Sequence, residues 1–291
     1  MTNYSDWGGP GSVILKKTLG SGPFTLNSQV TIPSAIVQPF KPLNTTYLQA
    51  INAAQGTSLS VAGNQTPAIA LRTYYKPTWG TAALLKSLIQ FRDTTTFYTD
   101  QFAMQVKSQY RTRKFSKGRC TGLTITHTKQ GNQPGPIIVD MGFVFIYGDL
   151  GGAPDDPSPP TFSAAATDAG QATNAGQVAW ATATQVKSFQ LQMNCVQEYQ
   201  FSDNNTLFAD DIATGPPDGG LALVQSDSYT AAPTTTDTLS LGGVGAGIAI
   251  ALNLDLHTPF TPQDGGFIKY NSAFKLANLT TGGIPWDITA L

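Results

Sequence analysis

Six basic side chains between positions 107 and 119 form the densest group of chemically active residues in the sequence. They are Lys107, Arg111, Arg113, Lys114, Lys117 and Arg119. Alternation of polar and apolar residues around them predicts a hairpin, with its turn at 114–118. Lys107, Arg111 and Arg113 share parity, so we expect them on the polar face of one strand. We call these six residues the basic hairpin.

Three interpretations of the basic hairpin differ in the partner that it would contact. A nucleic acid would place its phosphates there. A solvated sheet edge would use lysines to block unwanted strand pairing. An acidic surface on another copy of the chain would use complementary charge to fix the register of docking.

Charge is distributed unevenly along the 291 residues, although the net charge is only −1. Residues 1–129 carry 14 of the 17 Lys and Arg against three Asp, a net of +11. Residues 130–291 carry three Lys against 14 Asp and Glu198, a net of −12. We therefore favour docking of the basic half of one copy against the acidic half of the next.

Residues suited to catalysis are few, and we expect no enzymatic activity. There are two histidines, His127 and His257, and a lone histidine on a strand is far more often structural than catalytic. Cys120 and Cys195 lack an activating motif and are too few for a zinc site. We expect both thiols to be buried as small hydrophobic groups, in a protein folded in a reducing cytoplasm.

Segments of the sequence that could suggest a cofactor site, a metal site or a membrane span lack the flanking element, the spacing or the length that such a feature requires. The glycine-rich run 243–247 leads into a predicted strand, whereas a dinucleotide fold needs a helix whose N-terminus faces the pyrophosphate. The Asp and Asn residues at 203–205 and 210–211 do not have the spacing of a calcium loop. No apolar run reaches the roughly 18–20 residues that cross a bilayer. We therefore expect no cofactor, no metal and no membrane partner.

Composition predicts a mainly β protein as the scaffold for these side chains. Gly (29) and Pro (19) are abundant, charged residues make up 12%, and Glu198 is the only Glu, so good helix formers are scarce. One short helix is predicted within 78–94, capped by Thr78 or Thr81. Its apolar face consists of Leu84, Leu85, Leu88 and Ile89.

Clean alternation of apolar and polar residues predicts antiparallel strands with one buried face. These strands cover 102–110, 119–128, 137–147, 189–201, 248–256 and 268–276. We expect four regions: an extended N-terminal arm (1–37), with room for one strand at its short apolar piece Val13–Leu15, a first β domain (38–148), a linker or long surface loop (149–186) and a second β domain (187–291). The 149–186 boundary rests on its many turn-forming residues and its lack of apolar periodicity.

The order of these features resembles the tail tube (major tail) proteins of long-tailed bacteriophages, in the form that carries two tube-like halves per chain. The resemblance covers roughly residues 60–148 and 187–291 and rests on the order and spacing of several segments. They are 80–88 (GTAALLKSL), the strand Phe102–Tyr110, 117–125 (KGRCTGLTI), 188–194 (SFQLQMN), 265–270 (GGFIKY) and 282–289 (GGIPWDIT).

This resemblance implies two tandem antiparallel β-sandwich or barrel-like tube domains and a structural role in the virion, after synthesis in the bacterial host cytoplasm. Copies of the chain would form homotrimeric rings with pseudo-sixfold symmetry, which stack into a tube. The family's partners are tape-measure, tail-terminator and distal tail proteins, and phage DNA passes through the lumen without specific binding. No cofactor is implied. The arm and the 149–186 loop would tie neighbouring rings together.

Two further functions compete with a tail tube. One is another virion component, such as a decoration or baseplate protein. The other is a carbohydrate-binding β-sandwich, which would need clustered exposed aromatic residues. A hydrolytic version of that sandwich is disfavoured, because the usual catalytic pair of carboxylates is hard to assemble with a single Glu.

Overall fold

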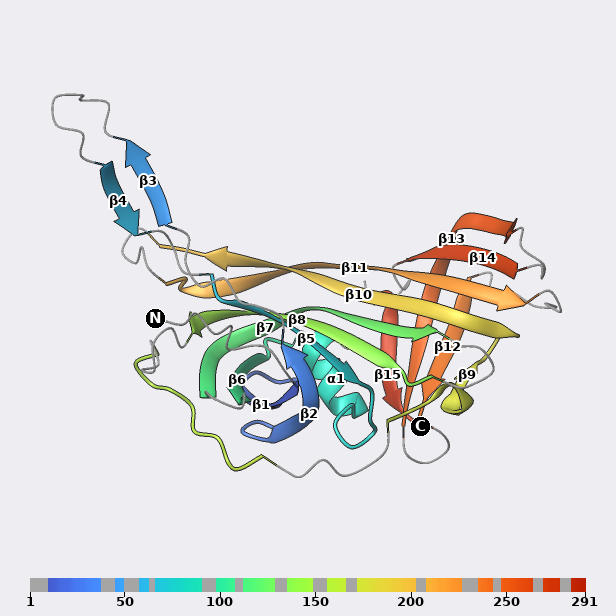
Figure 1. The fold of residues 1–291 in the computed structure, drawn as a ribbon, viewed down its shortest axis with the longest axis horizontal. Helices are drawn as coiled ribbons and strands as arrows, with labels where there is room; N and C mark the ends of the chain where they lie inside the picture. Colours follow the sequence, from blue (N-terminus) through green and yellow to red (C-terminus); the bar gives the residue numbers. More distant parts are fainter. Residues whose placement is uncertain are drawn as a thin grey trace.

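The fold is described from a computed structural model of the chain (Figure 1). The structure describes residues 10–37, 45–49, 58–62, 66–90, 98–107, 112–128, 135–148, 156–165, 172–202, 208–226, 235–242, 247–263, 269–277 and 284–291. Over these residues the chain is mainly β, with antiparallel pairing and one short α-helix, as the sequence predicts.

The described residues of the first half form eight strands and the helix. They are β1 (Pro10–Leu19), β2 (Gln29–Val37), β3 (Thr45–Gln49), β4 (Ser58–Ala62), β5 (Ala68–Tyr74), α1 (Ala82–Ile89), β6 (Gln101–Lys107), β7 (Thr112–Thr128) and β8 (Ile138–Gly148). Six of these strands pair in the order β6-β1-β2-β5-β8-β7, and β7 pairs back to β6. We call this ring of strands the closed sheet. Closure leaves these strands without a long free edge between β6 and β7.

The described residues of the second half form a 3-10 turn, η1 (Ala175–Gln177), followed by seven strands. They are β9 (Val178–Trp180), β10 (Val186–Gln200), β11 (Asp211–Ser226), β12 (Thr236–Leu241), β13 (Ile248–Gln263), β14 (Lys269–Leu276) and β15 (Trp286–Ala290). Their order is β10-β11-β14-β13-β12-β9, with β15 beside β13. We call this the open sheet.

The two sheets are joined by direct hydrogen bonding between β7 and β10, from Gly122–Asn194 to Thr128–Ser188. Most of the described buried apolar residues of both halves also form one continuous core, and Ile146, Ala209 and Ile212 form a second, smaller cluster. Figure 1 shows β10 and β11 as two long strands that cross the closed sheet and continue beyond it. The division into two tandem domains therefore stays a prediction, while the continuity of the sheet is a property of the structure.

Helix α1 lies where the two halves meet, and contacts β7, β10 and β15. Thr81 is its N-cap, because its hydroxyl oxygen accepts a hydrogen bond from the backbone N–H of Leu84 at 3.4 Å. The predicted face of Leu84, Leu85, Leu88 and Ile89 is buried. The helix and its cap were thus predictable from local spacing.

Three sequence-based expectations differ from the structure. Residues 10–37, expected as an extended arm with one strand at Val13–Leu15, form two paired strands, β1 and β2, because Val13 and Leu15 are fully buried in the core. The turn expected at 114–118 is wrong: these residues lie within β7, which begins at Thr112. Within the expected linker 149–186, β9 pairs with β12 and η1 precedes it.

Two further features complete the fold. β3 and β4 form a separate two-stranded sheet, drawn apart from the other strands in Figure 1. In the described part of the chain no helix has the length and apolar character to cross a membrane.

Candidate functional site

The basic hairpin exists as an antiparallel pair of β6 and β7, but its residues do not share one face. Lys107 lies opposite Thr112 and is exposed. Arg113 lies opposite the buried Val106, so it is on the inward face. The chain passes from β6 to β7 between Lys107 and Thr112. Odd-numbered Lys107 therefore points outward on β6, whereas odd-numbered Arg113 points inward on β7, and the two do not share a face as the sequence predicted. Arg111 lies outside the described residues.

Lys114 and Lys117 each lie over an aromatic ring of the same chain. The Lys114 Nζ is 6.0 Å from the centre of the Phe162 ring, and the Lys117 Nζ is 5.0 Å from that of Tyr147. Lys117 has a positive φ of 52° at a β-bulge, where β7 has one more residue than β6 between Gly118 and Phe115. Lys117 is exposed, whereas Lys114 is half-buried.

Arg119 contacts two residues of β11 in the same chain. Its Nη1 donates to Thr214 Oγ1 at 2.9 Å, and its Nη2 lies 3.9 Å from Asp211 Oδ1. Its side chain is only 14% exposed, and this burial lowers its pKa, an effect that the Asp211 charge opposes. We infer that Arg119 fastens β11 to β7, so the exposed members of the basic hairpin in the described chain are Lys107 and Lys117.

A segment of the expected linker covers the neighbouring face of the closed sheet. Ser116 donates a hydrogen bond from its hydroxyl to Asp156, and Lys16 Nζ donates to the Thr161 carbonyl at 3.0 Å. The Ser163 N–H donates to Gln29 Oε1 at 3.0 Å. Residues 156–165 thus lie against the outer side of β7, β1 and β2 of their own chain.

An acidic surface that was not predicted from the sequence lies on the C-terminal part of β10 and the N-terminal part of β11. Along β10 the even-numbered residues from 190 to 200 are exposed, and Glu198 is one of them. On β11, Asp211 and Asp218 are exposed and pair in register with Gln200 and Asn194. Directly opposed residues point to the same face. We call Glu198, Asp211 and Asp218 the acidic ribbon face; the period-two pattern around Glu198 was the signal that could have identified it.

Part of the charge asymmetry between the halves is satisfied within one chain. Among the described residues, three ion pairs join residues of 1–129 to residues of 130–291. They are Arg72–Asp140, Lys86–Asp287 and Arg119–Asp211. The charge left for docking between copies is therefore smaller than the values of +11 and −12. It is best represented by Lys107 and Lys117 on one side and by Glu198 and Asp218 of the acidic ribbon face on the other.

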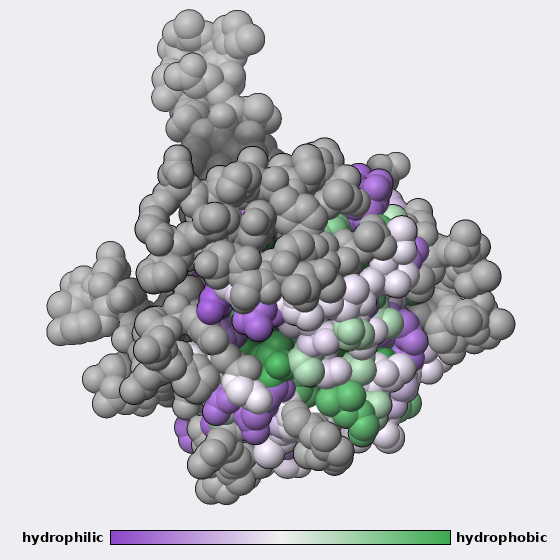
Figure 2. Space-filling model, turned by 90° about the vertical axis from the view of Figure 1, so that its right-hand side faces the viewer, coloured by the Kyte–Doolittle hydropathy of each residue, from purple (hydrophilic) through white to green (hydrophobic). Residues whose placement is uncertain are grey.

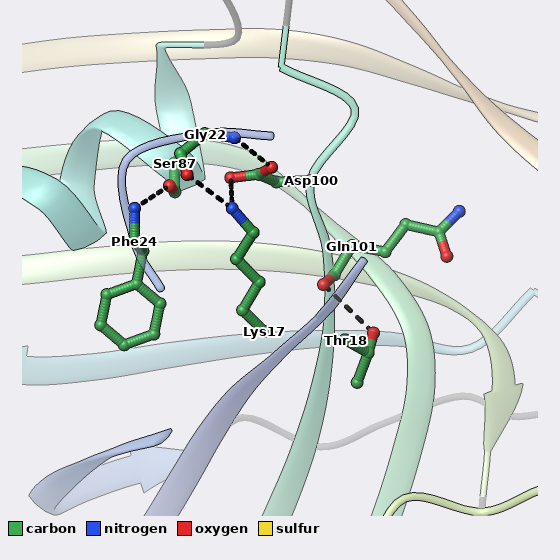
Figure 3. A network of polar contacts seen from close by, with 7 residues as sticks. All are labelled: Lys17, Thr18, Gly22, Phe24, Ser87, Asp100 and Gln101. Atoms are coloured by element: carbon green, nitrogen blue, oxygen red, sulfur yellow. Dashed lines mark hydrogen bonds and ion pairs between the residues drawn. The ribbon is translucent and has the colours of Figure 1, made fainter. Parts of the chain in front are cut away.

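A buried polar network beneath the turn between β1 and β2 was also absent from the sequence-based expectations (Figure 3). Lys17 Nζ lies 2.9 Å from Asp100 Oδ2, and both side chains are 1% exposed. Lys17 also donates to the Gly22 carbonyl at 2.8 Å, and the Gly22 N–H donates to Asp100 Oδ1 at 2.8 Å. The Phe24 N–H donates to Ser87 Oγ of α1 at 2.9 Å. The network ties the turn between β1 and β2 to α1 and to the start of β6.

His127, Cys120 and Cys195, which were considered for catalysis, are all buried in the structure. His127 is buried, as expected from its alternation, and its ring lies 5.9 Å from that of Phe189. Cys120 and Cys195 are free and buried, and burial raises the pKa of the Cys120 thiol to about 12 and that of Cys195 further. The His257 side chain, residues 243–246 and residues 203–205 lie outside the described part of the chain.

Among the described residues no group of three or more His, Cys, Asp or Glu is arranged to hold a metal ion. Comparison with known proteins adds no assignment: no protein-family model matches the chain, and no curated protein sequence matches it.

Proposed function

We propose that this chain is a structural protein that assembles with copies of itself into stacked rings, forming the tail tube of a long-tailed bacteriophage. The observation that carries the proposal is the separation of exposed charge, with Lys107 and Lys117 on the closed sheet and the acidic ribbon face on β10 and β11. Opposite charges on different surfaces of one chain favour head-to-tail contacts, which close into rings or extend into filaments.

The resemblance of the sequence to tail tube proteins supplies the rest of the proposal. In that setting the rings are homotrimeric with pseudo-sixfold symmetry, and the tube serves as a passive conduit for DNA. Tape-measure, tail-terminator and distal tail proteins are the further partners, and the site of action is the virion.

The carbohydrate-binding alternative has less support. Of the large hydrophobic side chains that are exposed in the described part of the chain, Tyr74 is the one aromatic. A sugar-binding platform requires several such rings on one face, because sugar rings stack on aromatic faces.

Electron microscopy of the purified protein, over a range of concentrations, tests the proposal directly. We expect rings or hollow tubes, whereas a strict monomer at high concentration would overturn it. The variant Lys107→Glu/Lys117→Glu should assemble less at low salt, since like charges would then face each other.

A charge exchange provides the matched control. Adding Glu198→Lys and Asp218→Lys to the reversed variant should restore assembly, because attraction returns with the signs interchanged. If the reversed variant forms tubes as readily as the unmodified protein, charge docking is wrong. If the unmodified protein binds DNA with a steep salt dependence and does not assemble, the nucleic-acid interpretation replaces it.

A further inference from the structure

A cavity of about 210 Å³ lies beside β9 and the start of β10, and none of the residues that line it belongs to the basic hairpin or the acidic ribbon face. Val178 and Lys187 line it and are partly exposed, so it opens to solvent. Its exposed lining is more polar than apolar, which suits a ligand with polar groups. Figure 1 places β9 at the right-hand end of the molecule. Figure 2 shows that end face on, with hydrophilic and apolar side chains next to one another.

The loop that joins β9 to β10 forms one wall of this cavity and is fixed by buried side chains of two other strands. The Asp237 carboxylate of β12 accepts hydrogen bonds from the N–H groups of Thr182 and Ala183, at 2.8 and 3.0 Å. Gln225 of β11, which is fully buried, donates from Nε2 to the Thr184 carbonyl at 2.8 Å. A wall that is held in place before a ligand arrives loses little conformational entropy when the ligand binds.

Two hydrogen-bond donors among the lining residues have no partner in the described part of the chain. The Trp180 Nε1 is buried without a hydrogen bond, and an indole nitrogen can only donate. The Lys187 ammonium makes neither an ion pair nor a hydrogen bond with any described residue. A buried donor without a partner costs free energy, and an acceptor supplied by a ligand would recover it. Together, the two donors favour a ligand that carries oxygen acceptors and a negative charge.

Aromatic and aliphatic side chains complete the lining and give room for a small apolar body. The Phe189 ring meets the Trp180 ring edge-on, with centres 5.3 Å apart and an angle of 85° between the planes. A cavity of about 150 Å³ admits a benzene ring, so the volume here leaves space for a small ring and one attached polar group. No Asp or Glu occurs among the described lining residues, so a negatively charged group meets no like charge in the lining.

We propose that this cavity binds a small organic carboxylate. Lys187 pairs with the carboxylate, Trp180 Nε1 donates to one of its oxygens, and Phe189 packs against the apolar body. The inference goes beyond the proposed structural role and does not depend on self-assembly, because every residue of the site belongs to one chain. The carboxylate is that of a free acid or of the C-terminal residue of a polypeptide, and the probes below distinguish these two sources.

Isothermal titration calorimetry of the purified full chain with benzoate tests this site. We expect a Kd of about 1 mM or below. Benzamide has the same shape without the charge and should bind about tenfold or more weakly, because it cannot form an ion pair with Lys187. Equal affinity for benzoate and benzamide, or no binding of benzoate at about 10 mM, would overturn the proposal.

Acetyl-alanyl-phenylalanine, with its carboxyl group free or amidated, identifies the source of the carboxylate. Tighter binding of the free-carboxyl peptide than of benzoate assigns the site to the end of a polypeptide. Tighter binding of benzoate assigns it to a free acid. If the amidated peptide binds as tightly as the free one, the carboxylate is not recognised and the proposal is wrong.

Two substitutions in the cavity should weaken benzoate binding. Lys187→Gln should raise the Kd about tenfold or more, and Trp180→Phe, which keeps an aromatic ring but removes the N–H, about threefold to tenfold. Lys275→Gln is the matched control for charge, because Lys275 is exposed on β14 and does not line the cavity. Trp286→Phe is the control for the indole, because the Trp286 Nε1 is also buried without a partner but lies elsewhere.

Both controls should leave the Kd for benzoate within about twofold of the value for the unmodified protein. Circular dichroism shows whether each variant is folded. If Lys275→Gln and Trp286→Phe weaken binding as much as the two cavity substitutions do, benzoate binds elsewhere and the site is wrongly assigned.

Discussion

Lys17–Asp100 and Arg72–Asp140 are ion pairs of similar length in opposite surroundings. The shortest distances are 2.9 Å and 2.7 Å, but the first pair is 1% exposed on both sides while the second is 55% and 33% exposed. Water and salt can replace either partner at Arg72, whereas nothing replaces Asp100 beside Lys17. Because the two distances are similar, we infer that burial, and not distance, determines how much each ion pair matters for stability.

Lys86–Asp287 lies between these extremes and joins α1 to the C-terminal strand β15. The Lys86 Nζ is 3.0 Å from Asp287 Oδ1, with side chains 22% and 44% exposed. Gln90, which is buried, donates from Nε2 to the same Asp287 oxygen at 2.9 Å and accepts from the Ile288 N–H at 3.0 Å. The three pairs thus form a graded series from core to surface.

The largest loss of stability is expected for Lys17–Asp100, the most buried of the three ion pairs. Asp100→Ala should reduce the free energy of unfolding by about 3–5 kcal/mol, because it leaves the Lys17 ammonium buried without a counter-charge. Chemical denaturation followed by circular dichroism measures the loss. The double variant Lys17→Met/Asp100→Leu should recover much of it, since no charge is then left unpaired. A loss below about 1 kcal/mol for Asp100→Ala would remove the contrast with the exposed pair.

An intermediate, pH-dependent effect is expected at Asp287. Burial alone would raise its pKa, but hydrogen bonds from Gln90 and Lys86 and the Lys86 charge lower the pKa below its ordinary value. Because the folded pKa is lower than the unfolded value of about 3.9, the contribution is present above that value and is lost as the pH falls through the folded pKa. Asp287→Asn should therefore be less stable than the unmodified protein at pH 7, with the difference shrinking below about pH 4.

Urea denaturation of both proteins from pH 7 to pH 2.5 measures this difference. Asp140→Asn is the matched control, because it removes a carboxylate of the exposed pair. A difference for Asp287→Asn that stays constant across the range would show that the carboxylate charge contributes nothing.

Local patterns predicted elements better than they predicted partners. The spacing of Leu84, Leu85, Leu88 and Ile89 identified the helix, and odd-even alternation identified β8, β10, β13 and β14. Both signals are periodic and arise from burial of one face. The apolar piece Val13–Leu15 indicated a strand, but the pairing of β1 with β2 and β6 was not predicted, because the surrounding glycine and proline residues resemble a loop.

The partners of charged residues could not be predicted, since they depend on pairing between distant segments. Lys17 meets Asp100 only because β1 lies beside β6, and Arg119 meets Thr214 only because β10 pairs with both β7 and β11. Summing charge along the sequence counted Arg72 and Lys86 as available for another copy, although each has an acidic partner in its own chain. Net charge constrains association and solubility and does not assign contacts.

The smallest loss of stability is expected for Arg72–Asp140, the most exposed of the three ion pairs, although its hydrogen-bond geometry is the best of the three. Arg72 makes two parallel hydrogen bonds to Asp140, Nε to Oδ1 at 2.7 Å and Nη2 to Oδ2 at 3.0 Å. Arg72→Ala should nevertheless cost only about 0–1 kcal/mol of unfolding free energy, because water solvates both groups when they separate. The difference from the unmodified protein should fall further between 50 mM and 1 M salt, whereas that of Asp100→Ala should not. A salt-insensitive loss at Arg72 as large as that at Asp100 would show that exposure does not govern these pairs.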